Sequence, residues 1–305
     1  MKFAAIDIGT NAVRLLLAKV VEGGDRPIFE KESFVRIPLR LGEDTFLHGR
    51  ISDEKTESLA ETMIGFRHLM AAYRAVDFKA YATSAMREAE NGDEVARKVR
   101  ERSGIELTVI SGKTEAEVIY ANHIEERLGP ARNYLYIDVG GGSTELNLIS
   151  RGKVVASKSV NIGSVRMLEG KVDESQWKDM KAWLKENTPA LRPIYGIGMG
   201  GNINKIFQLA RVKEGRPISY NEVRRLYDYL ASFTLEERIA ELGLRPDRAD
   251  VILLAGEIYL SVMKWAKVKK MYVPQIGLAD GIIHIVYERF RNHAPAGAAS
   301  PLYPN

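Results

Sequence analysis

The sequence carries one pattern twice, 131 residues apart, and this repeat limits the folds open to the chain. In each copy an apolar run has an aspartate near its end. A short turn that contains glycine follows this run, and a second apolar run follows the turn. The four runs are residues 3–8, 13–20, 134–139 and 145–149. Two apolar runs joined by a short polar turn are typical of a β-hairpin. The repeat therefore predicts two related halves, each opening with a hairpin whose turn follows Asp7 or Asp138.

The segments around these hairpins alternate between strand and helix patterns. Short apolar runs predict further strands at 34–39, 78–83, 107–110, 153–160 and 271–274. Apolar residues spaced by three and four predict a helix that begins at Ser52. Other helices are expected at 91–102, from about Thr114, and at 173–187, 219–231, 248–266 and 278–291. Strands that alternate with helices in this way predict an α/β architecture.

The length of the chain fits two domains. It has 305 residues, and one domain usually takes roughly 100–200. We expect one domain over residues 1–126, a second over 127–293, and a disordered tail, rich in Ala and Pro, over 294–305. The Gly129-Pro130 turn, directly before the second copy of the repeat, supports a boundary in this region.

Composition excludes several classes of function. Cysteine is absent, which rules out disulfides, thiolate metal sites and cysteine nucleophiles. The first strand begins at Phe3 and no apolar run approaches the roughly 18 residues of a membrane span, so we expect a cytoplasmic protein without a signal or membrane segment. The formal net charge of +4 would not repel a polyanion. No block of like charge resembles a nucleic-acid-binding tail, and we expect neither nucleic acid nor membrane as a partner.

The two glycine turns are candidate phosphate-binding loops. A strand that ends in such a turn presents successive backbone N–H groups, which can surround phosphate oxygens. Asp7 would then lie within reach of a metal bound to the phosphate, although Gly9–Asn11 also fits a simple β-turn that Asp7 caps. The turn at Gly140–Gly142 is compatible with a flexible loop but favours a ligand, because three successive glycines cost conformational entropy. Glu145, which starts the return strand, is suited to face a cation.

A third glycine-rich stretch, residues 196–202, leads into a helix that is expected near Asn202. Such a turn offers N–H groups and the positive end of the helix dipole to an anion at Gly200 and Gly201. The stretch lacks the glycine spacing of a dinucleotide-binding fingerprint, so taken alone it is a weak signal.

Two other segments have both a structural and a functional interpretation. Thr114 and Glu117 have the spacing of a capping box, and Glu115 between them would complement the helix dipole. Arg87 follows a predicted strand, where it is suited to clamp a phosphate or to lie on a solvated helix face. Arg248 heads a long helix, and ion pairing is its expected role.

Eight stretches, in matching order and spacing over nearly the whole chain, resemble the exopolyphosphatase and guanosine pentaphosphatase family. They are AIDIGTNAVRLL (5–16), ATSAMREAENG (82–92), ISGKTEAEVIY (110–120), YIDVGGGSTEL (136–146), GSVRMLEG (163–170), GMGGN (198–202), RADVILLAGEI (248–258) and GLADGII (277–283). The resemblance implies two actin-like domains, the fold of ribonuclease H, sugar kinases, heat-shock chaperones and actin, with a cleft between them. Longer relatives carry additional C-terminal domains, and this chain resembles the short, two-domain type.

The resemblance also implies roles for individual residues. Glu115 falls at the position of the general base that orients the attacking water, and Arg87 matches a substrate-associated arginine. Asp138 and Glu145 fall at positions tied to a divalent metal, usually Mg²⁺, with Asp7 as a third candidate ligand. The candidate phosphate-binding residues are Thr10, Asn11, Gly140, Gly141, Gly142, Ser143, Thr144, Gly200 and Gly201. Ala12 departs from the family pattern, because a serine is frequent there.

These roles lead to an expected function, the Mg²⁺-dependent release of orthophosphate from the end of inorganic polyphosphate. The nearest alternative is the same reaction on guanosine pentaphosphate, a nucleotide of the stringent response. A kinase of the same superfold and a non-catalytic polyanion-binding regulator are alternatives of other classes. A homodimer is compatible with the resemblance, whereas the sequence does not fix the preferred chain length of the substrate.

Overall fold

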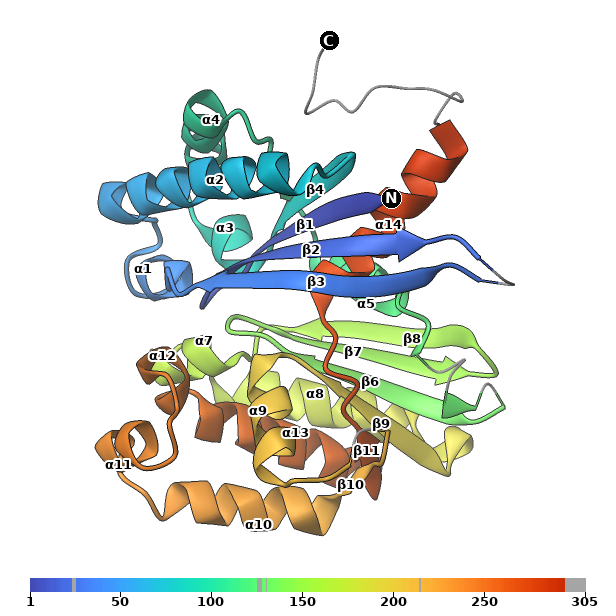
Figure 1. The fold of residues 1–305 in the computed structure, drawn as a ribbon. Helices are drawn as coiled ribbons and strands as arrows, with labels where there is room; N and C mark the ends of the chain where they lie inside the picture. Colours follow the sequence, from blue (N-terminus) through green and yellow to red (C-terminus); the bar gives the residue numbers. More distant parts are fainter. Residues whose placement is uncertain (24–25, 125–127, 130, 214, 294–305) are drawn as a thin grey trace. The chain divides into compact units, whose positions relative to one another are not determined.

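The computed structural model describes residues 1–23, 26–124, 128–129, 131–213 and 215–293. The chain divides into two compact units (Figure 1). Unit 1 combines Met1–Asn122 with the described residues from Leu278 onward, and unit 2 is His123–Gly277. Each unit contains one mixed β-sheet with helices packed on it, so the predicted α/β class is confirmed.

The sheet of unit 1 has the strand order β3-β2-β1-β4-β5. The three strands that come first in the chain are antiparallel, and β4 and β5 continue parallel to β1. The strands are β1 (Lys2–Ile8), β2 (Val13–Val21), β3 (Ile28–Ile37), β4 (Asp77–Ala82) and β5 (Thr108–Val109). The predicted hairpin of residues 3–20 is therefore present as β1 and β2.

The sheet of unit 2 repeats this topology. From β8 across to β11 its order is β8-β7-β6-β9-β11, with the first three strands antiparallel and the next two parallel to β6. The strands are β6 (Asn133–Val139), β7 (Thr144–Ser150), β8 (Lys153–Val160), β9 (Ile194–Met199) and β11 (Lys270–Tyr272), and β10 (Ile218–Ser219) adds an antiparallel edge. The sequence repeat thus corresponds to a duplicated fold, in which each glycine turn joins the first two strands of its sheet.

Helices cover both faces of the sheet in unit 1. Side chains alternate along the central strand β1, so this strand has apolar side chains to bury on each face. Ala4, Ile6 and Ile8 enter the core with the apolar stripe of α2, whereas Phe3 contacts two aromatic rings of α14. Asp7 shares the face of Phe3, since residues two and four apart point the same way. The helices are α1 (Leu41–His48), α2 (Asp53–Tyr73), α3 (Ser84–Glu88), α4 (Gly92–Ser103), α5 (Gly112–Tyr120) and α14 (Leu278–His293).

The core of unit 2 forms around the helix α13 (Ile252–Ala266), which contacts β6, β9, α8 and α10. Nine of its fifteen residues are buried, which explains why its sequence is apolar nearly all round. The other helices are α7 (Ser164–Leu168), α8 (Glu174–Asn187), α9 (Gly201–Leu209), α10 (Tyr220–Ala231), α11 (Leu235–Ala240) and α12 (Pro246–Ala249).

The last helix returns to the first unit, which the sequence did not indicate. The expected boundary put residues 278–293 in the second domain, but α14 makes its contacts with β1, β2, β4 and α5 (Figure 1). Phe3 packs edge-on against Tyr287 and Phe290 in this contact. The expected tail at 294–305, Pro130 and the boundary at residues 126 and 127 lie outside the described residues.

Several predicted elements have different limits in the structure. The helix expected from about Thr114 begins at Gly112, because Ser111 caps it by accepting a hydrogen bond from the backbone N–H of Thr114 at 3.1 Å. The expected capping box of Thr114 and Glu117 is therefore wrong. Strand β9 was not predicted, since its glycines resembled a loop. An ideal Cβ at Gly198 would lie 2.7 Å from the sulfur of Met271, so this glycine permits close packing of β9 against β11.

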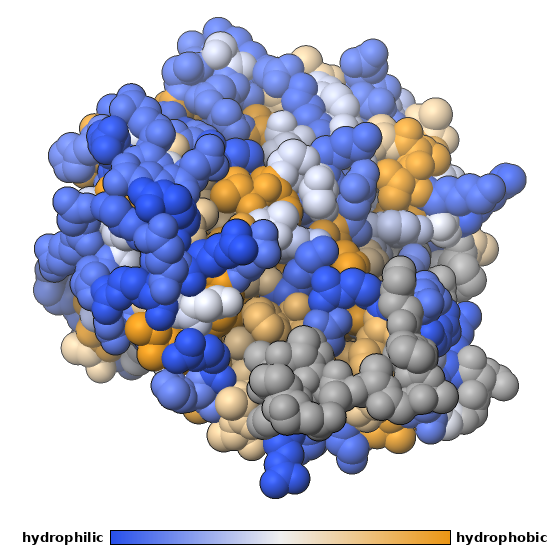
Figure 2. All heavy atoms as spheres, turned by 90° about the horizontal axis from the view of Figure 1, so that it is seen from above, coloured by the Kyte–Doolittle hydropathy of each residue, from blue (hydrophilic) through white to orange (hydrophobic). Residues whose placement is uncertain are grey.

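The surface of the molecule is mostly polar in the view of Figure 2. Hydrophilic side chains cover most of that face, and hydrophobic residues form separate patches among them. None of the described helices is both long enough and apolar enough to cross a membrane.

Candidate functional site

The predicted site residues of each unit lie just beyond the carboxyl ends of parallel strands. In unit 1 the turn after Asp7 follows β1, Arg87 follows β4 and Glu115 follows β5. In unit 2 the triglycine turn follows β6, and Gly200 follows β9. Open α/β sheets bind ligands at this edge. The fold thus brings most of the predicted residues to the edge where a ligand site is expected in each unit.

The loop of unit 1 is closed by backbone hydrogen bonds that use its carbonyl groups. The N–H of Gly9 donates to the carbonyl of Ala12 at 3.1 Å. The carbonyl of Thr10 accepts from the N–H of Gly42 at 2.9 Å, at the start of α1, and that of Asn11 accepts from the N–H of Arg40 at 3.1 Å. The carbonyl oxygens of the loop are therefore held by the segment behind it, and a loop fixed in this way is suited to present N–H groups to an anion.

The loop of unit 2 has the same arrangement around its glycines. The N–H of Gly140 donates to the carbonyl of Ser143 at 2.9 Å, and the carbonyls of Gly140 and Gly141 accept from the first N–H groups of α7 at 2.8–3.0 Å. The carbonyl of Gly142 accepts from Nε of the buried Arg166 at 2.7 Å. An ideal Cβ at Gly163 would lie 2.4 Å from the carbonyl oxygen of Gly141, so only glycine allows α7 to approach the loop this closely.

The hydroxyl groups of Ser143 and Thr144 support this loop from within. Ser143 donates to Oε1 of Glu145 at 2.7 Å, and Thr144 donates to the carbonyl of Ile162 at 2.6 Å. Thr144 is fully buried and Ser143 is 2% exposed. A hydroxyl has one proton to donate, and here both protons are used within unit 2. A phosphate contact of Ser143 or Thr144 stays a prediction.

The turn at Gly200 and Gly201 is built around two charged side chains. Gly200 has a φ of 106°, which favours glycine, and an ideal Cβ there would lie 3.1 Å from Oδ1 of Asp138. An ideal Cβ at Gly201 would lie 3.0 Å from Nη2 of Arg248. The two glycines therefore leave room for the Asp138 carboxylate and the Arg248 guanidinium beside the start of α9.

Tyr259 joins this turn to the end of β6. Its hydroxyl donates to the carbonyl of Met199 and accepts from the N–H of Val139 at 3.3 Å. Burial, and then the negative charge of Asp138, raise the pKa of this hydroxyl well above its usual value. Glu145 adds to the same effect. The tyrosine is therefore a neutral hydrogen-bonding group in the negative field of two carboxylates.

Asp138 and Glu145 face each other across the hairpin. They are directly opposed in the antiparallel register of β6 and β7, so their side chains lie on the same face of the sheet. Glu145 is 2% exposed and its Oε1 accepts from the hydroxyls of Ser143 and Ser159 at 2.7 and 3.0 Å. Like charges in opposed positions are destabilising, and the pair is therefore suited to a cation.

The donor set of this pair fits Mg²⁺. This ion prefers oxygen ligands and usually takes one or two carboxylates, with water and substrate phosphates completing its shell. Among the described residues, no group of three or more Asp, Glu or His side chains is placed to hold an ion. A metal site here would thus rest on Asp138 and Glu145. Asp7, the third candidate, has a different partner, because its Oδ2 lies 2.6 Å from Nη1 of Arg14.

Arg87 and Glu115 are brought together in unit 1. Nη1 of Arg87 donates to the carbonyl of Ile110 at 2.8 Å and lies 3.6 Å from Oε2 of Glu115. The side chains are 24% and 11% exposed, respectively. A largely buried carboxylate beside an arginine that reaches the surface is suited to proton transfer next to an anion. Arg87 therefore does not lie on a solvated helix face, and its contact with a phosphate stays a prediction.

The position of Glu115 depends on the contact between α5 and α14. An ideal Cβ at Gly281 of α14 would lie 1.9 Å from the carbonyl oxygen of Val118 on α5. The two helices therefore approach each other backbone to backbone, one turn along α5 from Glu115. Asp280, next to this crossing, pairs with Lys31 of β3 at 2.7 Å and fixes the start of α14 on the sheet.

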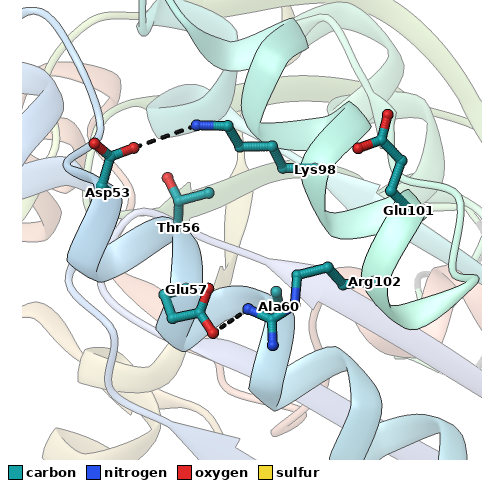
Figure 3. Close-up of a pocket in the computed structure, with 7 residues that line it drawn as sticks. All are labelled: Asp53, Thr56, Glu57, Ala60, Lys98, Glu101 and Arg102. Carbon is teal, nitrogen blue, oxygen red and sulfur yellow. Dashed lines mark hydrogen bonds and ion pairs between the residues drawn. The ribbon is translucent and has the colours of Figure 1, made fainter.

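A surface pocket of about 270 Å³ between α2 and α4 is separate from these residues (Figure 3). It is lined by Asp53, Thr56, Glu57, Ala60, Lys98, Glu101 and Arg102. Lys98 pairs with Asp53 at 3.3 Å, and Arg102 pairs with Glu57. Exposed ion pairs of this kind contribute little to stability. None of the predicted site residues lines this pocket, whose three carboxylates and two cations leave no excess of positive charge for a phosphate.

Comparison with known proteins identifies the family. The Ppx/GppA phosphatase family matches residues 18–290. The chain belongs to this family. Its relatives named exopolyphosphatase or pyrophosphatase are phosphoanhydride hydrolases, and membership places the chain in that class of enzymes. The resemblance noted from the sequence motifs is thus confirmed.

Two relatives and one solved structure illustrate the similarity. The bifunctional 3-dehydroquinate synthase/phosphatase of Fusobacterium nucleatum is 30% identical over 280 residues, which cover 84% of this chain but only 42% of that longer protein. Exopolyphosphatase 2 of Mycobacterium tuberculosis is 27% identical over 92% of this chain and 97% of its own. The crystal structure of an exopolyphosphatase from Cytophaga hutchinsonii has a TM-score of 0.81 at 23% identity, covers 98% of this chain and 100% of its own, and shows a shared fold.

Sequence reasoning missed the contacts by which four residues shape the site. Arg14 donates to Asp7, and Arg166 donates to the carbonyl of Gly142. The Gly200 turn is bordered by Arg248 and Tyr259. A signal existed for Arg14, because it lies 131 residues before Glu145 and so occupies the same place in the repeat. Tyr259 gives no local signal, since its partner Val139 is 120 residues away.

Proposed function

We propose that the chain is an exopolyphosphatase that releases orthophosphate from the end of inorganic polyphosphate with a divalent cation, Mg²⁺, as cofactor. The main support is the pair of glycine loops, each held from behind through its carbonyl groups, in a member of a phosphatase family. Loops of this kind bind phosphate through backbone N–H groups and need no nucleobase. A substrate made only of phosphates fits them.

In this proposal Glu115 is the general base. It takes a proton from a water molecule as the water oxygen attacks the terminal phosphorus. The new O–P bond forms while the bridging P–O bond breaks, and the shortened polyphosphate leaves with the negative charge. Arg87, 3.6 Å from Glu115, would bind the oxygens of the terminal phosphate. Phosphoryl transfer depends on positioning and charge neutralisation more than on covalent help.

Asp138 and Glu145 would hold the Mg²⁺ ion, which supplies charge neutralisation to the phosphates when it is bound. Their opposed register and shared face support this role. The hydroxyls of Ser143 and Ser159 orient the Glu145 carboxylate by donating to Oε1. The loop around Gly140–Gly142 would bind phosphate through its backbone, and so would the loop at Thr10 and Asn11.

Orthophosphate release from long-chain polyphosphate and from guanosine pentaphosphate, each with Mg²⁺ and with EDTA, tests this proposal. We expect turnover of polyphosphate that is lost in EDTA and restored by Mg²⁺. Faster release from the nucleotide would instead favour the guanosine pentaphosphatase alternative, an activity for which one relative is named. Release without any acceptor molecule excludes a kinase, and binding without turnover would point to a regulator. A homodimer and a cytoplasmic location are further proposals, which sedimentation and cell fractionation would test.

A further inference from the structure

The helices α1 and α3 contact each other in unit 1 and hold two parts of the proposed site (Figure 1). The start of α1 holds the loop, because the N–H groups of Arg40 and Gly42 donate to loop carbonyls at 3.1 and 2.9 Å. An ideal Cβ at Gly42 would overlap the side chain of Thr10, so α1 packs directly on the loop. The short helix α3 carries Arg87 near its end. Links between α1 and α3 therefore set the position of Arg87 relative to the loop.

Thr45 forms the first link between these two helices. It lies in α1 and is 5% exposed. Its hydroxyl donates to the carbonyl of Leu41 in the same helix and to the carbonyl of Ala85 in α3, both at 3.1 Å. A hydroxyl has one proton, which these two acceptors share. The side chain of Thr45 thus joins the backbone of α1 to that of α3 in the interior of the unit.

Asn91 forms a second link, just after these helices end. Its side-chain amide accepts from the N–H of Ile51 at 2.9 Å and donates to the carbonyl of Ile51 at 2.8 Å. One residue earlier, the N–H of Glu90 donates to the carbonyl of Gly49 at 2.9 Å. An asparagine directly before a helix commonly caps it, but both polar atoms of Asn91, which precedes α4, bind Ile51 instead. The amide therefore joins the segment after α3 to the segment after α1.

We propose that Thr45 and Asn91 are positioning residues, which hold Arg87 at a fixed place relative to the loop of unit 1. This inference rests on the proposed function, in which Arg87 binds the terminal phosphate and the loop at Thr10 and Asn11 binds phosphate through its backbone. Neither Thr45 nor Asn91 has to touch the substrate for this role. Each secures the series of contacts that runs from the loop through α1 to α3.

The alternative is that these links only stabilise the fold. Their loss would then lower the free energy of unfolding without changing how strongly the rate depends on Arg87. The positioning role differs in one measurable respect. It predicts that an enzyme with a broken link has already lost the contribution of Arg87, so that removal of the guanidinium then costs little more.

The experiment is a double-mutant cycle on orthophosphate release from polyphosphate, with kcat and KM measured for each protein. One cycle combines Arg87→Gln with Asn91→Ala, and a second combines Arg87→Gln with Thr45→Val. In both cycles the double variant should lose little more kcat/KM than Arg87→Gln alone, because residues that act through one another are not additive.

The two links should differ in the size of their effect. Asn91→Ala removes two hydrogen bonds and frees the segment after α3, so we expect kcat/KM to fall about ten- to a hundredfold. Thr45→Val places a methyl group 3.1 Å from the carbonyl oxygen of Ala85, whereas ordinary contacts begin at 3.4 Å. This smaller displacement should lower kcat/KM about three- to tenfold.

Two controls separate positioning from folding. Thr45→Ser keeps the hydroxyl and should turn over at close to the wild-type rate. Thr56 is also 5% exposed, and its hydroxyl donates to the carbonyl of Ser52 at 2.8 Å, at the start of its own helix α2. Thr56→Val removes a comparable buried hydroxyl whose bond stays within α2, and it should leave kcat and KM unchanged. Urea unfolding of each variant gives its folded fraction under the conditions of the assay.

Three results would overturn the positioning role. The first is a double variant in which the losses of Arg87→Gln and Asn91→Ala multiply, and the second is wild-type kinetics in both Asn91→Ala and Thr45→Val. The third is a wild-type rate in Arg87→Gln, because there would then be no contribution of Arg87 to position. Failure of the proposed function would look different, since the unaltered chain would release no orthophosphate from polyphosphate, and the inference would fail with it.

Discussion

Replacing Gly281 with alanine tests how the fold positions the proposed base. The new Cβ would lie 1.9 Å from the carbonyl oxygen of Val118, whereas ordinary contacts begin at 3.4 Å, so the backbones of α5 and α14 would have to separate by about 1.5 Å. Glu115 is in the first turn of α5 and would move with it. A misplacement of about 1 Å can cost on the order of a hundredfold in rate. We therefore expect Gly281→Ala to lower kcat for phosphate release about a hundredfold.

The effect on stability should be smaller than this displacement suggests. Overpacking usually costs about 1–3 kcal/mol, but alanine is favoured over glycine within a helix by about 1 kcal/mol. The free energy of unfolding, measured in urea, should fall by about 0–2 kcal/mol. Kinetics at a temperature well below the unfolding midpoint then report on the position of Glu115 and not on the folded fraction.

Gly65 offers a matched control in the same unit. It lies within α2, and nothing lies within 4 Å of an ideal Cβ at this position. Gly65→Ala should raise the free energy of unfolding by about 0.5–1 kcal/mol and leave kcat unchanged. A Gly281→Ala enzyme that turns over at the wild-type rate would refute the claim that the crossing of α5 and α14 positions the base.

Two other predictions concern unit 2. Tyr259→Phe removes the hydroxyl that joins the N–H of Val139 to the carbonyl of Met199. Each buried group left without a partner should lower the free energy of unfolding, measured in urea, by about 1–3 kcal/mol. A decrease below about 0.5 kcal/mol would contradict this bridge. Ser219 caps α10 in a capping box with Glu222. The hydrogen bond from the Ser219 hydroxyl, and to a smaller extent the one from the Ser219 backbone N–H, lowers the pKa of Glu222 below its usual 4.5. The stability from this lowered pKa is present above pH 4.5 and is lost as the pH falls through the folded-state value, so Ser219→Ala should cost about 1 kcal/mol at pH 7 and less near pH 3. A cost that does not vary with pH would speak against the assigned cause.

Much of the local structure could be predicted from the sequence. The pattern of apolar runs gave the β1–β2 and β6–β7 hairpins, because alternation and glycine turns act over a few residues. The helix stripe of Leu59, Met63, Phe66 and Met70 is buried as expected, since its spacing already defines one face of a helix. The repeat also predicted that Asp7 and Asp138 occupy equivalent places in two related sheets.

The features that the sequence did not reveal depend on contacts between distant segments. The return of α14 to unit 1 rests on packing of Phe3 against Tyr287 and Phe290, more than 280 residues apart. Gly198 resembled a loop residue because its reason for being glycine, the side chain of Met271, lies on another strand. The motif places Thr144 at a phosphate loop but does not reveal that its side chain is buried and donates to the carbonyl of Ile162, because this contact forms only once β8 and α7 are in position.

The proposed role of Glu115 is tested most directly by comparing Glu115→Gln with Glu117→Gln. Both changes remove one carboxylate from α5, but Glu115 is buried beside Arg87 whereas Glu117 is exposed two residues later. A general base is typically worth about 10²–10⁴-fold, so Glu115→Gln should lose that much of the Mg²⁺-dependent rate of phosphate release while still binding polyphosphate. Glu117→Gln should keep the wild-type rate. Full activity in Glu115→Gln would contradict the account.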